Sequence, residues 1–275
     1  MFERPNALLF ESRLNVRTTR RIKRCGAMAD RAIELADVRY RYPTGVDALR
    51  GVTFSVAVGE RVGLIGPNGA GKSTLMLALA GFVSAQGTIR VDGHAVSRAT
   101  ARHVRRHMGL VFQDPDDQLF MPRVGDDVAF GPTTMGLDPH EVHARVHEAL
   151  DAVELDGYED RAPYHLSVGE KRRAALATVL AMRPQILALD EPSANLDPRG
   201  RRRVIELLRG LPNTLLIAGH DLDLIMDICG RTVLMDAGRV VADGPAAEML
   251  NDRELLESHG LELPLAVAAR RDLAR

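Results

Sequence analysis

The chain has 275 residues, 45% of them hydrophobic, which is enough to bury the core of one large domain or of a domain with a subdomain. Its 36 basic and 37 acidic residues give a net charge of −1, which argues against a nucleic-acid partner. Two cysteines without a Cys-x-x-Cys pair argue against a disulfide or zinc framework. The longest mainly apolar run, residues 75–85, is too short to cross a bilayer, so any membrane role is expected to be peripheral.

Residues 1–28 form an arginine-rich segment without a sustained apolar period. The apolar run at residues 7–10 is too short for a cleaved signal peptide. We expect a disordered extension or a start codon placed upstream of a true start at Met28, because this composition gives little surface to bury. A basic segment that touches a membrane surface is the alternative. The folded domain is expected at residues 29–275.

The folded part opens with a pattern typical of an antiparallel β region. Residues 33–40 and 52–56 alternate polar and apolar side chains like half-buried strands, and Pro43 and Gly45 mark the turn between them. The next expected elements are strands at residues 61–65, 87–91 and 108–112 and a helix at residues 74–80.

Helical patterns dominate the middle of the chain and predict a helical insertion at roughly residues 114–180. Asp138 and Pro139 open one helix, and Glu141 at its third position predicts a capping box with Asp138 as the cap. A second helix is expected at residues 170–182.

The last third of the chain returns to strands. Residues 186–189 and 215–218 are continuous apolar runs, typical of parallel strands buried on both faces. Residues 232–235 and 239–242 predict a hairpin, and residues 245–275 a C-terminal tail. The whole pattern predicts an α/β fold with a parallel-sheet core, an antiparallel β region and an inserted helical region.

A glycine-rich loop lies between the expected strand at residues 61–65 and the helix that follows it. It fits the pattern GxxxxGK followed by Ser or Thr, with the residues Gly66, Pro67, Asn68, Gly69, Ala70, Gly71, Lys72 and Ser73. Backbone N–H groups of such a loop cradle phosphates, and the helix N-terminus adds its positive dipole. Lys72 can reach the phosphates, Ser73 can ligate Mg²⁺, and Thr74 extends the nucleotide-binding set. Average glycine usage predicts about one chance match per hundred chains of this length.

Two carboxylates, Asp190 and Glu191, follow the apolar run at residues 186–189. Asp190 is expected at the carboxyl end of a buried strand, where a Walker B aspartate holds the Mg²⁺ shell. Glu191 can polarise the attacking water as a general base. The alternative is a carboxylate pair that caps the next helix.

Residues 166–170, Leu-Ser-Val-Gly-Glu, resemble the LSGGQ signature of ABC ATPases, which are P-loop NTPases with a RecA-like core. Gln113 resembles the Q-loop glutamine, residues 193–197 the D-loop, His220 the H-loop histidine and Tyr42 the aromatic residue of the A-loop. The resemblance covers about residues 33–250 and includes six motifs in the expected order.

The resemblance implies a head-to-tail dimer, with ATP bound between the phosphate loop of one subunit and the signature of the other. Ser167 and the Gly169 N–H would contact the γ-phosphate across the interface, and Tyr42 would stack on adenine. Two departures stand in the signature, since Val168 replaces its first glycine and Glu170 its glutamine. A branched side chain restricts the backbone, which puts the hydrolysis rate in doubt.

The same resemblance assigns the catalytic and metal-binding residues. Glu191 and His220 would hold the attacking water, with Lys72 and Gln113 completing the catalytic set. The Mg²⁺ ligands would be Ser73, Gln113 and Asp190.

The Q-loop region at residues 113–132 and the tail at residues 259–264 look like those of energy-coupling-factor ATPases, particularly the nickel/cobalt group. That likeness implies import at the cytoplasmic face of the cell membrane, through integral membrane coupling and substrate-binding subunits. The second ATPase would be an identical subunit or a different ABC ATPase. Vitamin importers share much of the pattern. Rival readings are a soluble ABC ATPase of translation or DNA repair and a P-loop kinase or GTPase.

His140, His143 and His147 fall on one side of the helix that begins after Asp138. Helical histidines one turn apart can bind a metal ion. No carboxylate or cysteine is obviously shared with them, so we expect a solvated flank of the helix.

Overall fold

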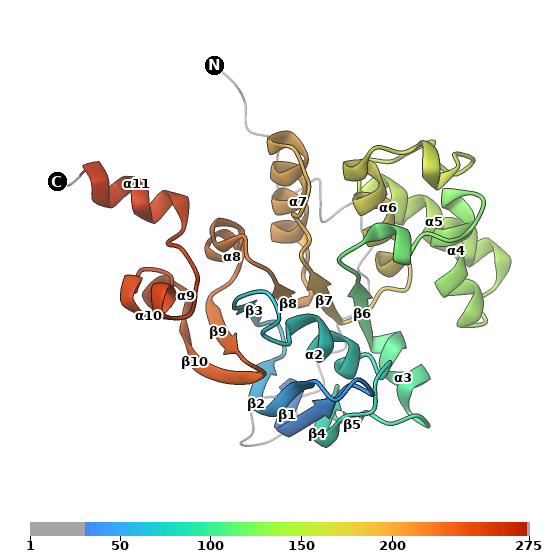
Figure 1. Ribbon diagram of the computed structural model, residues 1–275. Helices are drawn as coiled ribbons and strands as arrows, with labels where there is room; N and C mark the ends of the chain where they lie inside the picture. Colours follow the sequence, from blue (N-terminus) through green and yellow to red (C-terminus); the bar gives the residue numbers. More distant parts are fainter. Residues whose placement is uncertain (1–30, 274–275) are drawn as a thin grey trace, which may run out of the picture.

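The computed structural model describes residues 31–273, so the segment 1–28 lies outside the described residues. Its centre is a six-stranded sheet in the order β10-β9-β3-β8-β7-β6 (Figure 1). These strands are β3 (Arg61–Ile65), β6 (Met108–Val111), β7 (Ile186–Asp190), β8 (Thr214–Ala218), β9 (Arg231–Asp236) and β10 (Arg239–Pro245). Neighbouring strands run parallel except β9 and β10, which form the expected hairpin.

Both faces of the central sheet are buried. In β3, Leu64 packs into one apolar cluster while Ile65 packs into another, and in β8 Leu216 and Ile217 divide in the same way. Successive side chains of a strand point to opposite faces, so a strand covered on both sides needs an unbroken apolar run. This explains the continuous apolar character of these segments.

A second sheet lies below the first in the view of Figure 1 and has the strand order β2-β1-β4-β5. Its strands are β1 (Arg31–Arg41), β2 (Asp47–Ala57), β4 (Gln86–Val91) and β5 (His94–Ala95). Leu35 of β1 lies opposite Phe54 of β2 and Ile89 of β4, which places three buried apolar side chains in one row. The helix α2 (Lys72–Leu79) packs against both sheets, and its buried face includes Leu75 and Leu79.

A group of helices lies beyond β6 at one end of the central sheet (Figure 1). It contains α4 (Val124–Thr134), α5 (Pro139–Ala152) and α6 (Val168–Leu180), which pack on one another, and the short 3-10 turns η1 (Pro115–Asp117) and η2 (Pro163–His165). All of these elements fall within the predicted range 114–180. The helix α3 (Ala101–His107), which the sequence patterns did not indicate, leads into β6.

The capping box lies on a different helix from the one predicted. At α5, the Asp138 carboxylate accepts the backbone N–H of His140 at 2.9 Å, and Glu141 pairs with Arg145 instead of reaching back. The prediction of a capping box there is wrong, because the short Asp138 side chain satisfies the second N–H of the helix and leaves Glu141 free for its i+4 neighbour. The reciprocal pair occurs at α6, between Ser167 and Glu170.

The remaining helices follow the later strands of the central sheet. They are α7 (Pro198–Gly210), α8 (Leu222–Ile228), α9 (Ala246–Met249), α10 (Arg253–Ser258) and α11 (Leu265–Leu273). Helices α9–α11 lie beside β9 and β10, at the end of the molecule opposite α4–α6 (Figure 1). The Asp223 carboxylate of α8 accepts the backbone N–H groups of Leu265 and Ala266 and so anchors the start of α11. Within residues 31–273, no helix is both long and apolar enough to span a membrane.

Candidate active site

The glycine-rich loop has a backbone that only glycine adopts readily. Gly66 and Gly71 have φ angles of +148° and +100°. A Cβ atom on Gly66 would collide with the carbonyl oxygen of Met235, and one on Gly71 would lie 2.5 Å from that of Ala48. The tight turn therefore depends on both glycines. Between them, Pro67, Asn68, Gly69 and Ala70 carry the chain around to α2.

The start of α2 is arranged to receive an anion. Gly71 is its N-cap, and no side chain among the described residues caps the helix there, which leaves first-turn N–H groups for a ligand. The buried Lys72 Nζ donates to the carbonyl oxygens of Gly66 at 2.7 Å and Pro67 at 3.0 Å, so the loop encircles an ammonium group. Burial lowers the pKa of Lys72, while the nearby carboxylates Glu191 and Asp190 oppose that shift. Such a site suits phosphate groups.

The aromatic residue predicted to stack on adenine lies beside this helix. The Tyr42 hydroxyl is 2.9 Å from Thr74 Oγ1, so two residues of the predicted nucleotide set are joined by a hydrogen bond. The Tyr42 ring is half-buried and meets Tyr40 edge-on, with 5.0 Å between ring centroids. The hydrogen bond holds Tyr42 next to the phosphate loop.

The three predicted Mg²⁺ ligands line one cleft of about 670 Å³ between α2, η1 and α6. Asp190 reaches it from the end of β7, Ser73 from α2, and Gln113 from the segment after β6. Asp190 is buried and its Oδ1 has no hydrogen-bond partner within the described part of the chain. Burial raises the pKa of Asp190, and a hydrogen bond from Ser73 opposes the rise. An unpartnered carboxylate oxygen beside hydroxyl and amide oxygens fits the ligands that Mg²⁺ prefers.

Glu191 is held in a strained position next to His220. Its φ angle is +50°, which a residue with a side chain seldom adopts, and its side chain is buried. Glu191 Oε2 lies 2.8 Å from His220 Nδ1, whereas the histidine side chain itself is 65% exposed. The alternative in which Asp190 and Glu191 cap the next helix is wrong, because Asp197 caps α7. A buried carboxylate against an exposed imidazole can accept a proton from water at the surface of the site.

Arg172 joins several parts of the site, a role that the sequence analysis did not predict. Its side chain is 4% exposed, and its guanidinium donates to the carbonyl oxygens of Glu191 at 2.7 Å and Gln113 at 2.9 Å. Burial lowers the pKa of Arg172, and nearby carboxylates oppose the shift. A charged residue in a helix ordinarily predicts exposure. Only the position of these two carbonyl oxygens in space reveals the role of Arg172.

Two signature residues, Ser167 and Gly169, do not line the cleft of the predicted Mg²⁺ ligands, although Val168 between them does. Ser167 is the exposed N-cap of α6, and Gly169 is half-buried. Both line a second hollow with Arg203, and Asn195 lines both hollows. The chain thus presents Ser167 and Gly169 on a surface that adjoins that cleft but does not include the three predicted ligands.

The histidines of α5 differ in part from the expected solvated flank. His140 and His143 are exposed, but His147 Nδ1 lies 3.6 Å from Asp156 Oδ1 and 3.8 Å from Glu159 Oε1. The expectation that no carboxylate shares this helix flank is wrong, because the loop after α5 folds back beside His147. The three groups are largely exposed and lie close enough together to hold a metal ion.

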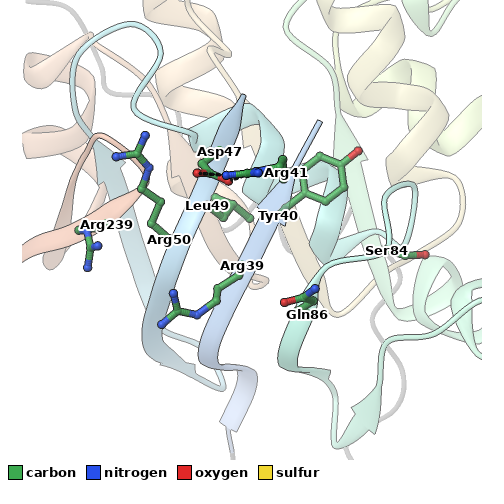
Figure 2. A pocket seen from close by; sticks show the side chains of 9 residues that line it. All are labelled: Arg39, Tyr40, Arg41, Asp47, Leu49, Arg50, Ser84, Gln86 and Arg239. Atoms are coloured by element: carbon green, nitrogen blue, oxygen red, sulfur yellow. Dashed lines mark hydrogen bonds and ion pairs between the residues drawn. The ribbon is translucent and has the colours of Figure 1, made fainter. Parts of the chain in front are cut away.

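A cavity on the antiparallel sheet has no phosphate-loop residue in its lining (Figure 2). It is lined by Tyr40 and by the four arginines Arg39, Arg41, Arg50 and Arg239, and Arg41 is paired with Asp47 in it. None of the residues predicted to bind phosphate or Mg²⁺ lines this cavity.

Known proteins match the chain over most of its length. The sequence profile of the ABC transporter family matches residues 49–194. A Gloeobacter violaceus protein, named provisionally as an ABC transporter ATP-binding protein, is 53% identical over 234 residues, or 84% of this chain and 96% of the relative. The energy-coupling factor transporter ATP-binding protein EcfA of Methanothermobacter thermautotrophicus is 47% identical over 238 residues, or 84% and 76%.

Solved structures share the fold. The structure of cbiO1 from Clostridium perfringens, part of the ABC transporter complex cbiONQ, has a TM-score of 0.74 and 35% identity and covers 88% of this chain and 99% of that one. A dimeric ATP-binding cassette in a post-hydrolysis state, bound to ADP and inorganic phosphate, has a TM-score of 0.71 and 25% identity and covers 78% and 98%. The chain belongs to the ABC transporter family, as an ATPase coupled to transport that resembles the energy-coupling-factor group.

Proposed function

We propose that this chain is the ATP-hydrolysing subunit of an energy-coupling-factor importer and works as half of a head-to-tail dimer. The observation that supports the proposal is that Ser167 and Gly169 line one hollow, whereas Ser73 and Asp190 line another. A complete site then needs the signature of a second subunit. That subunit is a second copy of this chain or a different ABC ATPase.

Within the site, the chain's own residues bind and orient ATP. The phosphate loop and Lys72 hold the phosphates, and Tyr42 stacks on adenine. Ser73, Gln113 and Asp190 would hold Mg²⁺, which would supply positive charge to offset that of the phosphates. Glu191 accepts a proton from the attacking water, and His220 orients that water and the γ-phosphate. The water oxygen bonds to the γ-phosphorus as the bond to the bridging oxygen breaks, which yields ADP and phosphate.

We place the membrane subunits on an apolar groove between α3, α4, α6 and β6. Three phenylalanines on this groove, Phe82, Phe120 and Phe130, are 45–61% exposed, and Phe120 and Phe130 meet edge-on at 5.2 Å. Arg102 and Arg105 line the same groove of about 680 Å³. An exposed aromatic groove with a basic edge fits an amphipathic helix that carries acidic residues. The groove adjoins Gln113 through Phe112, which links the seat of the partner to the cleft.

The chain then acts as a peripheral protein at the cytoplasmic face of the cell membrane. The cargo that we infer is a nickel or cobalt ion, on the local resemblance of residues 113–132 and 259–264. A vitamin is the alternative cargo. Cargo binds in the membrane subunits and not in the chain described here.

Reconstitution tests the assignment. The chain is co-expressed with candidate energy-coupling-factor membrane subunits, purified, and placed in vesicles loaded or bathed with Ni²⁺, Co²⁺ or vitamins. We expect slow ATP hydrolysis by the chain alone, and faster hydrolysis with accumulation of one cargo in the complex. A chain that copurifies with no membrane subunit, and that hydrolyses ATP at full rate alone, would instead be a non-transport ABC ATPase.

A further inference from the structure

The only hydroxyl proton of Ser167 is already engaged. Ser167 Oγ donates to Glu170 Oε2 at 2.7 Å, and the same carboxylate oxygen accepts the Ser167 backbone N–H at 2.8 Å. In return, Ser167 Oγ accepts the Glu170 N–H at 3.3 Å. A serine has one O–H to donate. The hydroxyl proton that would bond to a partner's γ-phosphate is therefore already bonded to a carboxylate of the same helix.

That carboxylate is fixed from a second direction. The Tyr158 hydroxyl donates to Glu170 Oε1 at 2.7 Å, from the loop between α5 and η2. The Tyr158 ring is half-buried and is stacked by Arg161 at 3.6 Å. Both carboxylate oxygens thus accept hydrogen bonds in a fixed orientation, and these bonds hold the pKa of Glu170 at about 2. Glu170 is an anion at any physiological pH.

We infer that Glu170 is a positioning residue that restrains the signature: it retains the Ser167 hydroxyl and releases it only when a partner's ATP competes for the proton. The inference rests on the proposed function, in which Ser167 meets nucleotide across the dimer. Hydrogen bonds to an ionised acceptor are roughly twice as strong as neutral ones, so the carboxylate is a strong competitor for this proton. The dimer of this chain then closes at a higher ATP concentration than it would with a neutral residue at position 170.

The substitution Glu170→Gln separates this role from the structural one. Glutamine has the same shape, and its carbonyl oxygen can accept both Ser167 donors while Tyr158 accepts from its amide. The cap of α6 is thereby kept, but the acceptor is neutral. A neutral acceptor holds the Ser167 hydroxyl proton less strongly than a carboxylate does. We therefore expect the variant to dimerise at an ATP concentration about fivefold lower.

The experiment measures dimerisation by analytical ultracentrifugation during ATP titration, with Glu191→Gln as the parent so that ATP is not consumed. Four proteins form a cycle: the parent, the parent with Glu170→Gln, the parent with Ser167→Ala, and the parent with both. We expect Glu170→Gln to lower the midpoint only where Ser167 is present. ATP binding to the monomer, measured at protein concentrations too low for pairing, should not change. Glu254→Gln, at the exposed first turn of α10, is the matched control and should leave the midpoint where it was.

The outcomes separate the two claims. An unchanged midpoint in Glu170→Gln overturns the inference, and so does an equal gain in the Ser167→Ala background, which would mean that charge acts without the hydroxyl. A parent that never dimerises with ATP overturns the proposed function and the inference with it. A gain confined to the Ser167 background, with unchanged ATP binding by the monomer, establishes the restraint.

Discussion

The phosphate-loop surface and the signature surface of this chain are built in opposite ways. Lys72, Asp190 and Glu191 are buried charged groups brought together from distant segments, and the strained backbone of Glu191 is held by the surrounding fold. The signature is an exposed N-cap whose bonds lie almost entirely within residues 166–170. The first surface is preformed within one chain. The second is stabilised locally and is complete only against a partner.

The largest expected effect comes from the preformed surface. In Glu191→Gln the side chain keeps its shape but no longer accepts a proton, so ATP turnover should fall by about 10²- to 10⁴-fold. ATP binding should persist and leave the dimer closed. Steady-state hydrolysis and equilibrium binding of ATP measure the two effects. Turnover at the normal rate in this variant would contradict the assignment of Glu191 as the base.

A substitution of Arg172 tests whether its two hydrogen bonds stabilise the buried phosphate-loop surface. Arg172→Met retains much of the apolar stem but leaves the carbonyl oxygens of Glu191 and Gln113 without their donor. Two charged hydrogen bonds are lost, so the free energy of unfolding should fall by about 3 kcal/mol, measured by urea titration. Arg202→Met on the exposed side of α7 is the control and should cost little. Equal stability of the two variants would show that Arg172 does not hold the site together.

The same contrast explains what could be predicted from the sequence. The strands, the phosphate loop and the signature were found because their signals are local: apolar period, glycine spacing and a short motif. The Glu191–His220 pair was expected only through a family resemblance, and its strain not at all. Arg172 and the Tyr158–Glu170 bond could not be predicted, because they join segments that are neighbours only in the folded chain. The capping box was assigned to the wrong helix because Asp138 and Ser167 both satisfy the local pattern.

Acid should weaken the signature surface through Glu170. The folded pKa of Glu170, about 2, lies below its ordinary value of 4.5, so its stabilisation is complete above pH 4.5 and is lost as the pH falls toward 2. The group is partly exposed, and solvent screening reduces the contribution to about 1 kcal/mol. Comparison of urea unfolding at pH 7 and pH 3 should show this loss in the native chain and not in Glu170→Gln. Equal pH dependence in both proteins would exclude the charge of Glu170 as its source.

The smallest effect concerns Val168, which stands where the family signature has glycine. Val168 is the first residue of α6 and its side chain is 49% exposed, so little packing is at stake. Val168→Gly should lower the free energy of unfolding by about 0.5 kcal/mol, because glycine loses more backbone freedom on folding. Val168→Ala shortens the side chain without giving the backbone the freedom of glycine, so it serves as the control. Thermal unfolding measures both variants. If the two variants unfold alike, backbone restriction at position 168 contributes nothing to the signature. If only the glycine variant is less stable, a side chain at position 168 stabilises the start of α6 by restricting its backbone.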